Sequence, residues 1–269
     1  MEFLSLLWNE GLLKPMTNAL VLLYILLLQN FGASIIVFTL FMRLVTIPLT
    51  LRQLRSSKAM MELQPKLAEL QKRYAKDRQR LQQETMRLWK QHGVNPVMGC
   101  LGPMLIQFPI WIALYYALIR ALPTTPDSLL GLAQVLYPWL QPVHGAVPLN
   151  SRFLWLDLGQ ADSTPVLPLL VGASMWVQQK MSTYPTTDPR MQQQSQMMLW
   201  MMPLLFAFFT FQFPSGLAVY WVVSNLVGIV IQYFVSGWGG LLPQKAPAQA
   251  SAPAQPAKER DAGRSGDKR

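Results

Sequence analysis

One continuous apolar stretch, Phe31–Leu51, constrains this chain more than any other feature. It is about as long as the ~20 helical residues that cross the hydrocarbon core of a bilayer. Arg43 lies within it, about 18 Å from one end and about 12 Å from the other at ~1.5 Å per helical residue. The nearest acidic residues in the sequence, Glu10 and Glu62, are too distant to neutralise it locally. An arginine at such depth costs at least ~2.5 kcal/mol and normally faces a bundle interior or a water-filled cavity. We therefore expect Arg43 to line a polar cavity; the alternative is that its long stem carries the charge to the headgroups.

The composition indicates a membrane protein with several spans. The chain is 51% hydrophobic and only 13% charged, whereas a soluble domain has about 25% charged residues. Its 269 residues leave room for five or six spans and for no large soluble domain. The single cysteine, Cys100, excludes an internal disulfide and a cysteine metal cluster. The N-terminus lacks a basic stretch followed by a small-residue cleavage site, so we expect no removable signal peptide.

The expected fold is an all-α polytopic membrane protein with a five-transmembrane-helix core, a cytoplasmic helical hairpin and an N-terminal interfacial helix. Residues 19–51 are too long for one span and too short for two, so we expect a break near residues 29–32, with residues 1–29 at the membrane interface. In the rival frame the first span is Ala19–Phe41 and Arg43 lies at the membrane edge. The core takes residues 30–236, with spans at about 31–51, 98–119, 164–184, 197–213 and 216–236, and the Pro/Ala/Gln-rich residues 237–269 form a disordered basic tail.

The segment 52–92 between the first two spans carries eleven Lys and Arg against four Asp and Glu. An apolar stripe from Met60 to Tyr74 and a second helical pattern over Arg78–Lys90 predict a basic helical hairpin, in which Pro65 kinks or breaks the first helix. The segments assigned to the inside carry eleven, two and six basic residues, whereas the outer loop 121–163 carries one. This asymmetry places the N-terminus outside and the C-terminus in the cytoplasm.

The expected spans contain no Asp or Glu, which removes the carboxylate relay of a proton-coupled carrier. No Walker-type glycine loop, HExxH or GxSxG motif is present, so we expect neither an enzyme nor a bound cofactor or metal. What the spans do offer, beside Arg43, is a set of neutral hydrogen-bonding side chains: Thr39, Gln107, Gln178, Gln179, Ser224 and Asn225. Each alone is more often a contact between helices; together they indicate a wet groove open toward the cytoplasm.

Four ordered motifs carry a resemblance to a known family. They are MRLVTIPLTLRQLRSSKAMMELQPKLAELQKRY (Met42–Tyr74), GVNPVMGCLGPMLIQFPIWIALYYAL (Gly93–Leu118), FLWLDLGQAD (Phe153–Asp162) and MMPLLFAFFTFQFPSGLAVYWVVSNLVGIVIQ (Met201–Gln232). From about Phe31 to Val235 the chain resembles the YidC/Oxa family of membrane protein insertases. The resemblance implies a hydrophilic groove that is closed on the outer side. It makes Arg43 the groove arginine and places further residues where family members line the groove or meet substrate: Thr39, Gln107, Gln178 or Gln179, Tyr220 and Trp221.

The implied function is that of an insertase and chaperone in the bacterial inner membrane, which inserts and helps to fold integral membrane proteins without nucleotide hydrolysis. The implied partners are nascent membrane proteins, membrane lipids and the ribosome, with no specific nucleic-acid sequence; participation of the Sec translocon stays open. Two alternatives are a small-anion transporter or channel that uses Arg43 as its selectivity charge, and an assembly factor that folds partners without inserting them.

Overall fold

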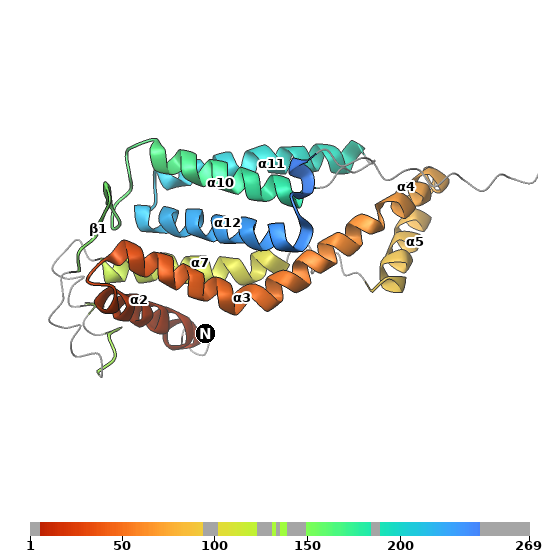
Figure 1. Cartoon of the computed structure of the whole chain (residues 1–269). Coiled ribbons are helices and arrows are strands. Elements are labelled where there is room, and N and C mark those ends of the chain that lie inside the picture. The colour runs from red at the N-terminus through yellow and green to blue at the C-terminus, as the bar shows by residue number, and fades with distance from the viewer. Residues whose placement is uncertain are drawn as a thin grey trace, which may run out of the picture.

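The computed structural model describes residues 6–93, 102–122, 131–132, 135–138, 149–183 and 189–242, with side chains for all of these but 60–61, 102–106 and 189–191 (Figure 1). The chain is predominantly helical, as the sequence predicts. In chain order the described elements are η1 (Asn9–Leu13), α2 (Lys14–Leu26), α3 (Phe31–Glu62), α4 (Gln64–Arg73), α5 (Arg78–Gln91), α7 (Gly102–Ala121), β1 (Arg152–Phe153), β2 (Leu156–Asp157), α10 (Val166–Ser182), α11 (Pro189–Thr210), α12 (Ser215–Ser236) and η2 (Gly239–Leu241).

Helix α12 lies among the long helices and contacts α3, α7, α10 and α11 (Figure 1). One end of this bundle carries the β1–β2 hairpin and the starts of α3, α10 and α12, and we call it the β end. The opposite end leads into α4 and α5. At the β end a Cβ on Gly216 would lie 3.0 Å from the Leu158 carbonyl oxygen and 3.1 Å from Ile35 Cδ1, so a larger residue would require these neighbours to shift.

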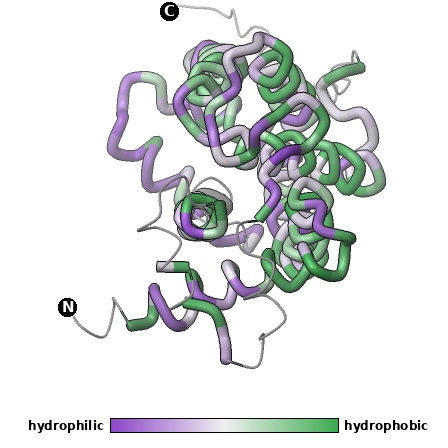
Figure 2. The backbone as a smooth tube through the Cα atoms, turned by 90° about the vertical axis from the view of Figure 1, so that its left-hand side faces the viewer, coloured by the Kyte–Doolittle hydropathy of each residue, from purple (hydrophilic) through white to green (hydrophobic). Residues whose placement is uncertain are grey.

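Two of the described helical segments, Phe31–Ala59 and Ser215–Ser236, are long and apolar enough to cross a membrane. Helix α10 has 17 residues, near the lower limit for a membrane span, and α11 opens with the polar sequence PRMQQQSQ. Large apolar side chains are nevertheless exposed on the bundle, including Phe41 and Leu44 on α3 and Leu204 and Phe208 on α11. Viewed along the bundle, hydrophobic turns also occupy its periphery (Figure 2). Exposed apolar surface of this extent is typical of contact with a membrane or a partner.

The helix bounds differ from the expected spans. Helix α3 continues past Leu51 to Glu62, and α11 begins at Pro189 and ends at Thr210, earlier at both ends than the expected span 197–213. Hydropathy marks only the apolar part of a helix, whereas the glutamine-rich start of α11 has good helix propensity without being apolar. Residues 98–101 of the second expected span and 243–269 of the expected tail lie outside the described residues.

The N-terminal helix α2 packs against α3 and α7 and buries Leu20, Val21 and Tyr24. It ends where residues 27–30 reverse the chain, with φ of +56° at Leu28 and +60° at Gln29. This reversal lies beside the break expected near residues 29–32. Because α2 is buried against α3 and α7, it forms part of the helix bundle.

Beyond α3 the chain forms a helical hairpin. Leu63 interrupts the helix and Pro65 lies in the first turn of α4, so the proline marks a break. Asp77 caps α5 by accepting a hydrogen bond of 3.0 Å from the Arg80 backbone nitrogen. Lys66 Nζ lies 3.1 Å from His92 Nε2, which places the start of α4 beside the end of α5 and makes the two helices antiparallel.

Candidate functional site

Helix α12 holds four of the nine predicted site residues, and its polar side chains point in two directions. Tyr220 and Ser224 are one helical turn apart and bond partners on α7 and α3. Asn225 and Gln232 bond partners on α10. The nine predicted residues therefore do not form one cluster, because α12 separates a polar group shared with α3 and α7 from another shared with α10.

Arg43 reaches from α3 to α12. Its Nε and Nη2 atoms both donate to Ser224 Oγ, at 2.9 and 2.5 Å, and Ser224 is buried while Arg43 is half-buried. In the part of the chain that the structure describes, no carboxylate lies within ion-pair distance of Arg43. A serine hydroxyl satisfies two N–H groups but leaves the positive charge uncompensated, so the remaining N–H groups can attract an anionic group.

Gln107 and Tyr220 join α7 to α12 on the same side of α12. Gln107 Nε2 donates to the Tyr220 hydroxyl at 2.6 Å; Gln107 is exposed and Tyr220 is buried. Together with Arg43 and Ser224 they give four polar side chains from three helices. We call this set the α3–α7–α12 polar site.

Two of the predicted groove residues take part in packing. Thr39 is fully buried, and its hydroxyl donates to the Ile35 carbonyl of its own helix at 2.6 Å. Trp221 is buried among aromatic rings, with its centroid 5.9 Å from that of Trp111 and 4.9 Å from that of Phe206. Both side chains therefore take part in helix packing.

The other direction of α12 carries a second row of contacts, which we call the α10–α12 polar seam. Asn225 Nδ2 donates to Ser174 Oγ at 3.1 Å, and Ser182 Oγ donates to Gln232 Oε1 at 3.0 Å. Between them the Gln178 amide lies so close to Gly228 that a Cβ there would collide with it. Gln179 is half-buried, and its backbone carbonyl accepts a bond from Thr183 Oγ1 at 2.8 Å.

Sequence reasoning missed Ser174, Ser182 and Gln232 as members of this seam. A signal was present, because Ser174, Gln178 and Ser182 follow one another at four-residue spacing and so share one face of α10. That pattern predicts a polar face but does not identify the helix that covers it.

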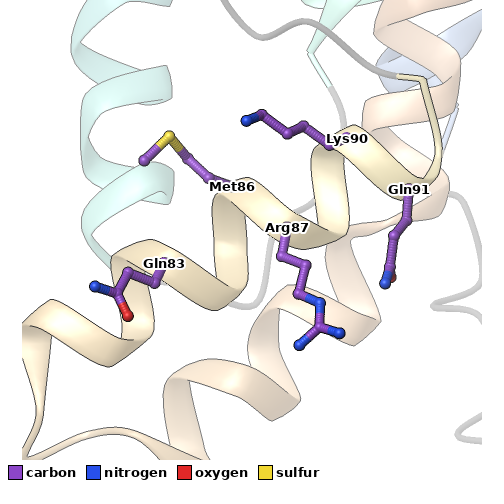
Figure 3. Close-up of a pocket in the computed structure, with 5 residues that line it drawn as sticks. All are labelled: Gln83, Met86, Arg87, Lys90 and Gln91. Atoms are coloured by element: carbon purple, nitrogen blue, oxygen red, sulfur yellow. The ribbon is translucent and has the colours of Figure 1, made fainter.

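A separate concave surface lies on α5, away from these contacts. It has a volume of about 410 Å³ and is lined by residues that recur on one side of the helix: Gln83, Met86, Arg87, Lys90 and Gln91 (Figure 3). A second one of about 380 Å³ lies between α4 and α5 and is lined by basic, acidic and apolar side chains. Among the described residues, no group of three or more His, Cys, Asp or Glu could hold a metal ion.

Comparison with known proteins identifies the family. The family model for the 60Kd inner membrane protein matches residues 23–239. The chain is 37% identical over 234 residues to the membrane protein insertase MisCA of Bacillus subtilis, covering 86% of this chain and 79% of that protein. It is 38% identical over 227 residues to the membrane protein insertase YidC of Oceanobacillus iheyensis, covering 81% and 79%. With the YidC of Histophilus somni it shares 40% identity over 228 residues, covering 85% of this chain and 37% of that protein.

The matched residues include all four motifs on which the resemblance rested, and the resemblance is thereby confirmed. The chain belongs to the 60Kd inner membrane protein family, that is, the YidC/Oxa family.

Proposed function

We propose that this protein is a membrane protein insertase and chaperone that takes nascent membrane proteins as substrates. The observation that carries the proposal is the state of Arg43, a half-buried guanidinium held by the Ser224 hydroxyl with no carboxylate partner among the described residues. Three relatives match this chain over about four fifths of their own length, and all three are named membrane protein insertases, which supports the assignment. The comparisons give no support to the alternative of a small-anion transporter.

The proposed topology has α3, α7, α10, α11 and α12 crossing the bacterial inner membrane. The α4–α5 hairpin and the C-terminus face the cytoplasm, and the β end and the N-terminus face outward. The charge asymmetry supports this orientation, because segment 52–92 carries eleven basic residues and the loop 121–163 carries one. Basic side chains on the hairpin would meet anionic lipid headgroups or the ribosome.

In the proposed mechanism, the hydrophilic tail of a substrate enters from the cytoplasm and is attracted to Arg43. Gln107 is the exposed member of the α3–α7–α12 polar site and would offer the tail a neutral hydrogen-bond partner, while Tyr220 and Ser224 orient Gln107 and Arg43. Transfer of the apolar span into lipid supplies ~25 cal/mol per Å² of buried apolar area. The membrane potential adds ~2.3 kcal/mol per charge per 100 mV for an acidic tail moving outward. The step therefore needs no nucleotide hydrolysis.

The remaining predicted residues take supporting roles in this proposal. Thr39 and Trp221 keep α3 and α12 packed against their neighbours, since both are buried. Gln178, Gln179 and Asn225 line or border the α10–α12 polar seam, where they would contact a substrate only after α10 moves away from α12. We propose that this movement accompanies release of the substrate span toward lipid.

Photo-crosslinking in reconstituted vesicles without any other translocase tests the proposal. A photoreactive amino acid at Gln107 should form adducts with a nascent single-span protein, whereas one at Leu169, which is 68% exposed on the outside of α10, serves as the matched control. Arg43→Gln should slow insertion of an acidic-tailed substrate more than that of the same substrate with a neutral tail. Equal slowing of both substrates would remove the charge from the mechanism. Insertion without adducts at Gln107 would place the substrate path elsewhere.

A further inference from the structure

The β1–β2 hairpin presents two large apolar side chains at its turn. Leu154 is 76% exposed and Trp155 is 54% exposed, while the strand residue that follows them, Leu156, is buried. The pairing of Phe153 with Leu156 leaves Leu154 and Trp155 as a two-residue connection between the strands. The tip of the hairpin is therefore apolar and has no covering neighbour among the described residues.

The base of the hairpin is fixed to the bundle at the β end. The Phe153 ring lies against Gly32 near the start of α3, where any Cβ would collide with the ring. At the start of α12, Ser215 Oγ donates to the Asp157 carbonyl at 2.6 Å and the Gly216 nitrogen donates to the Leu158 carbonyl at 3.1 Å. The hairpin is thus held at the level where α3 and α12 begin.

The backbone of the turn also favours a role for the leucine side chain. Leu154 has a φ of +54°, and glycine normally takes the first position of a two-residue hairpin turn with positive φ. A bulky apolar residue in that conformation, exposed at a tip, serves neither the turn nor the hydrophobic core. On the outward side of the strands, the exposed Arg152 and Asp157 face each other across the pair. The hairpin therefore changes from charged at its base to apolar at its tip.

We propose that Leu154 and Trp155 insert into the lipid at the outer surface of the membrane and fix the depth of α3 and α12. The occupant is lipid because the tip lies at the level of the helix ends, where tryptophan is enriched at the membrane–water interface. Arg152 and Asp157 then lie among the headgroups. Since Arg43 lies on α3 and Ser224 on α12, the hairpin also sets the depth of the α3–α7–α12 polar site. The inference rests on the proposed topology but not on insertase activity.

Fluorescence quenching by lipid-borne nitroxides tests this contact directly. The only cysteine, Cys100, is replaced by serine, and Trp155→Cys carries an environment-sensitive fluorophore in vesicles of phosphatidylcholine and phosphatidylglycerol. Gln160→Cys, exposed beyond the base of the same hairpin, is the matched control. Lipids with a nitroxide near the headgroup should quench the label at position 155 at least twofold more than the label at position 160. Equal quenching at both positions, together with equal quenching by iodide from water, would overturn the proposal.

Leu154→Gly separates lipid insertion from turn geometry. Glycine accepts the positive φ, so the protein should unfold in detergent at the same temperature as the parent or higher. In vesicles the same change should reduce nitroxide quenching of the label at position 155, because the tip has then lost both of its native apolar side chains. Unchanged quenching would show that the leucine does not hold the tip in the lipid. None of these readouts requires substrate insertion, so a failure here leaves the proposed function to its own test.

Discussion

The bond between Arg43 and Ser224 makes a quantitative prediction. Ser224 Oγ accepts from both Nε and Nη2 of Arg43, at 2.9 and 2.5 Å, and the hydroxyl is buried. Hydrogen bonds to charged groups contribute about 1.5–3 kcal/mol in soluble proteins, whereas mutant cycles in a membrane protein average ~0.6 kcal/mol and reach ~1.7. Because two N–H groups share this acceptor, we expect a coupling near the upper value, between about 1 and 2 kcal/mol.

The measurement is a double-mutant cycle on the free energy of unfolding in mixed detergent micelles. Ser224→Ala should lower it by about 1–2 kcal/mol more in the parent protein than in the Arg43→Met background. Ser174→Ala is the matched control, because Ser174 bonds Asn225 on the other side of α12 and should be additive with Arg43→Met to within ~0.5 kcal/mol. A coupling below ~0.3 kcal/mol for the Ser224 pair would show that the arginine is not held by this hydroxyl, and the proposed orientation of Arg43 would fail.

Three further predictions concern hydrogen bonds and packing within the helix bundle and at its β end. Asn18→Ala should lower the free energy of unfolding by about 1–3 kcal/mol, as measured by chemical denaturation. The Asn18 side chain is 3% exposed, donates to the carbonyl of residue 135 and accepts from the nitrogen of residue 137. An unchanged free energy of unfolding would contradict these bonds. Gly32→Val should destabilise the β end by at least ~1 kcal/mol through collision with Phe153, and Phe153→Ala should partly rescue it in thermal unfolding. Gln107→Ala should lower the free energy of unfolding more than Tyr220→Phe does. The first change leaves the buried Tyr220 hydroxyl without its partner, whereas after the second the exposed Gln107 side chain can turn to solvent. The reverse order would refute this asymmetry.

The features predictable from the sequence are those set by neighbouring residues. The chain reversal before α3 and the break at Pro65 follow from local residue types, and the helices follow from runs of apolar or helix-favouring residues. The partner of Arg43 was not predictable, since Ser224 lies 181 residues away and several polar residues in other helices were equal candidates. Only the packing of α3 against α12 selects among them.

Burial of individual residues was also beyond the sequence. In a helix that is apolar on all sides, no periodicity indicates which face meets protein and which meets lipid. The family resemblance places Thr39 and Trp221 in the groove, and the structure buries both side chains among neighbouring residues. The β1–β2 hairpin was missed because strands of two residues are too short to show an alternating pattern.

The α10–α12 polar seam allows a last prediction, because one of its donors has no acceptor among the residues that the structure describes. Gln232 Oε1 accepts from Ser182, but within the described residues no acceptor reaches its buried Nε2. A buried donor without an acceptor lowers the free energy of unfolding by about 1–3 kcal/mol, whereas replacing both partners of a hydrogen bond by apolar groups of similar shape changes it little. Gln232→Met should therefore cost less stability in mixed-micelle unfolding than Ser182→Ala, and the double mutant should unfold close to the parent. If Gln232→Met proves the more costly change, Nε2 has a partner from outside the described residues, and the seam must be treated as a binding surface in its own right.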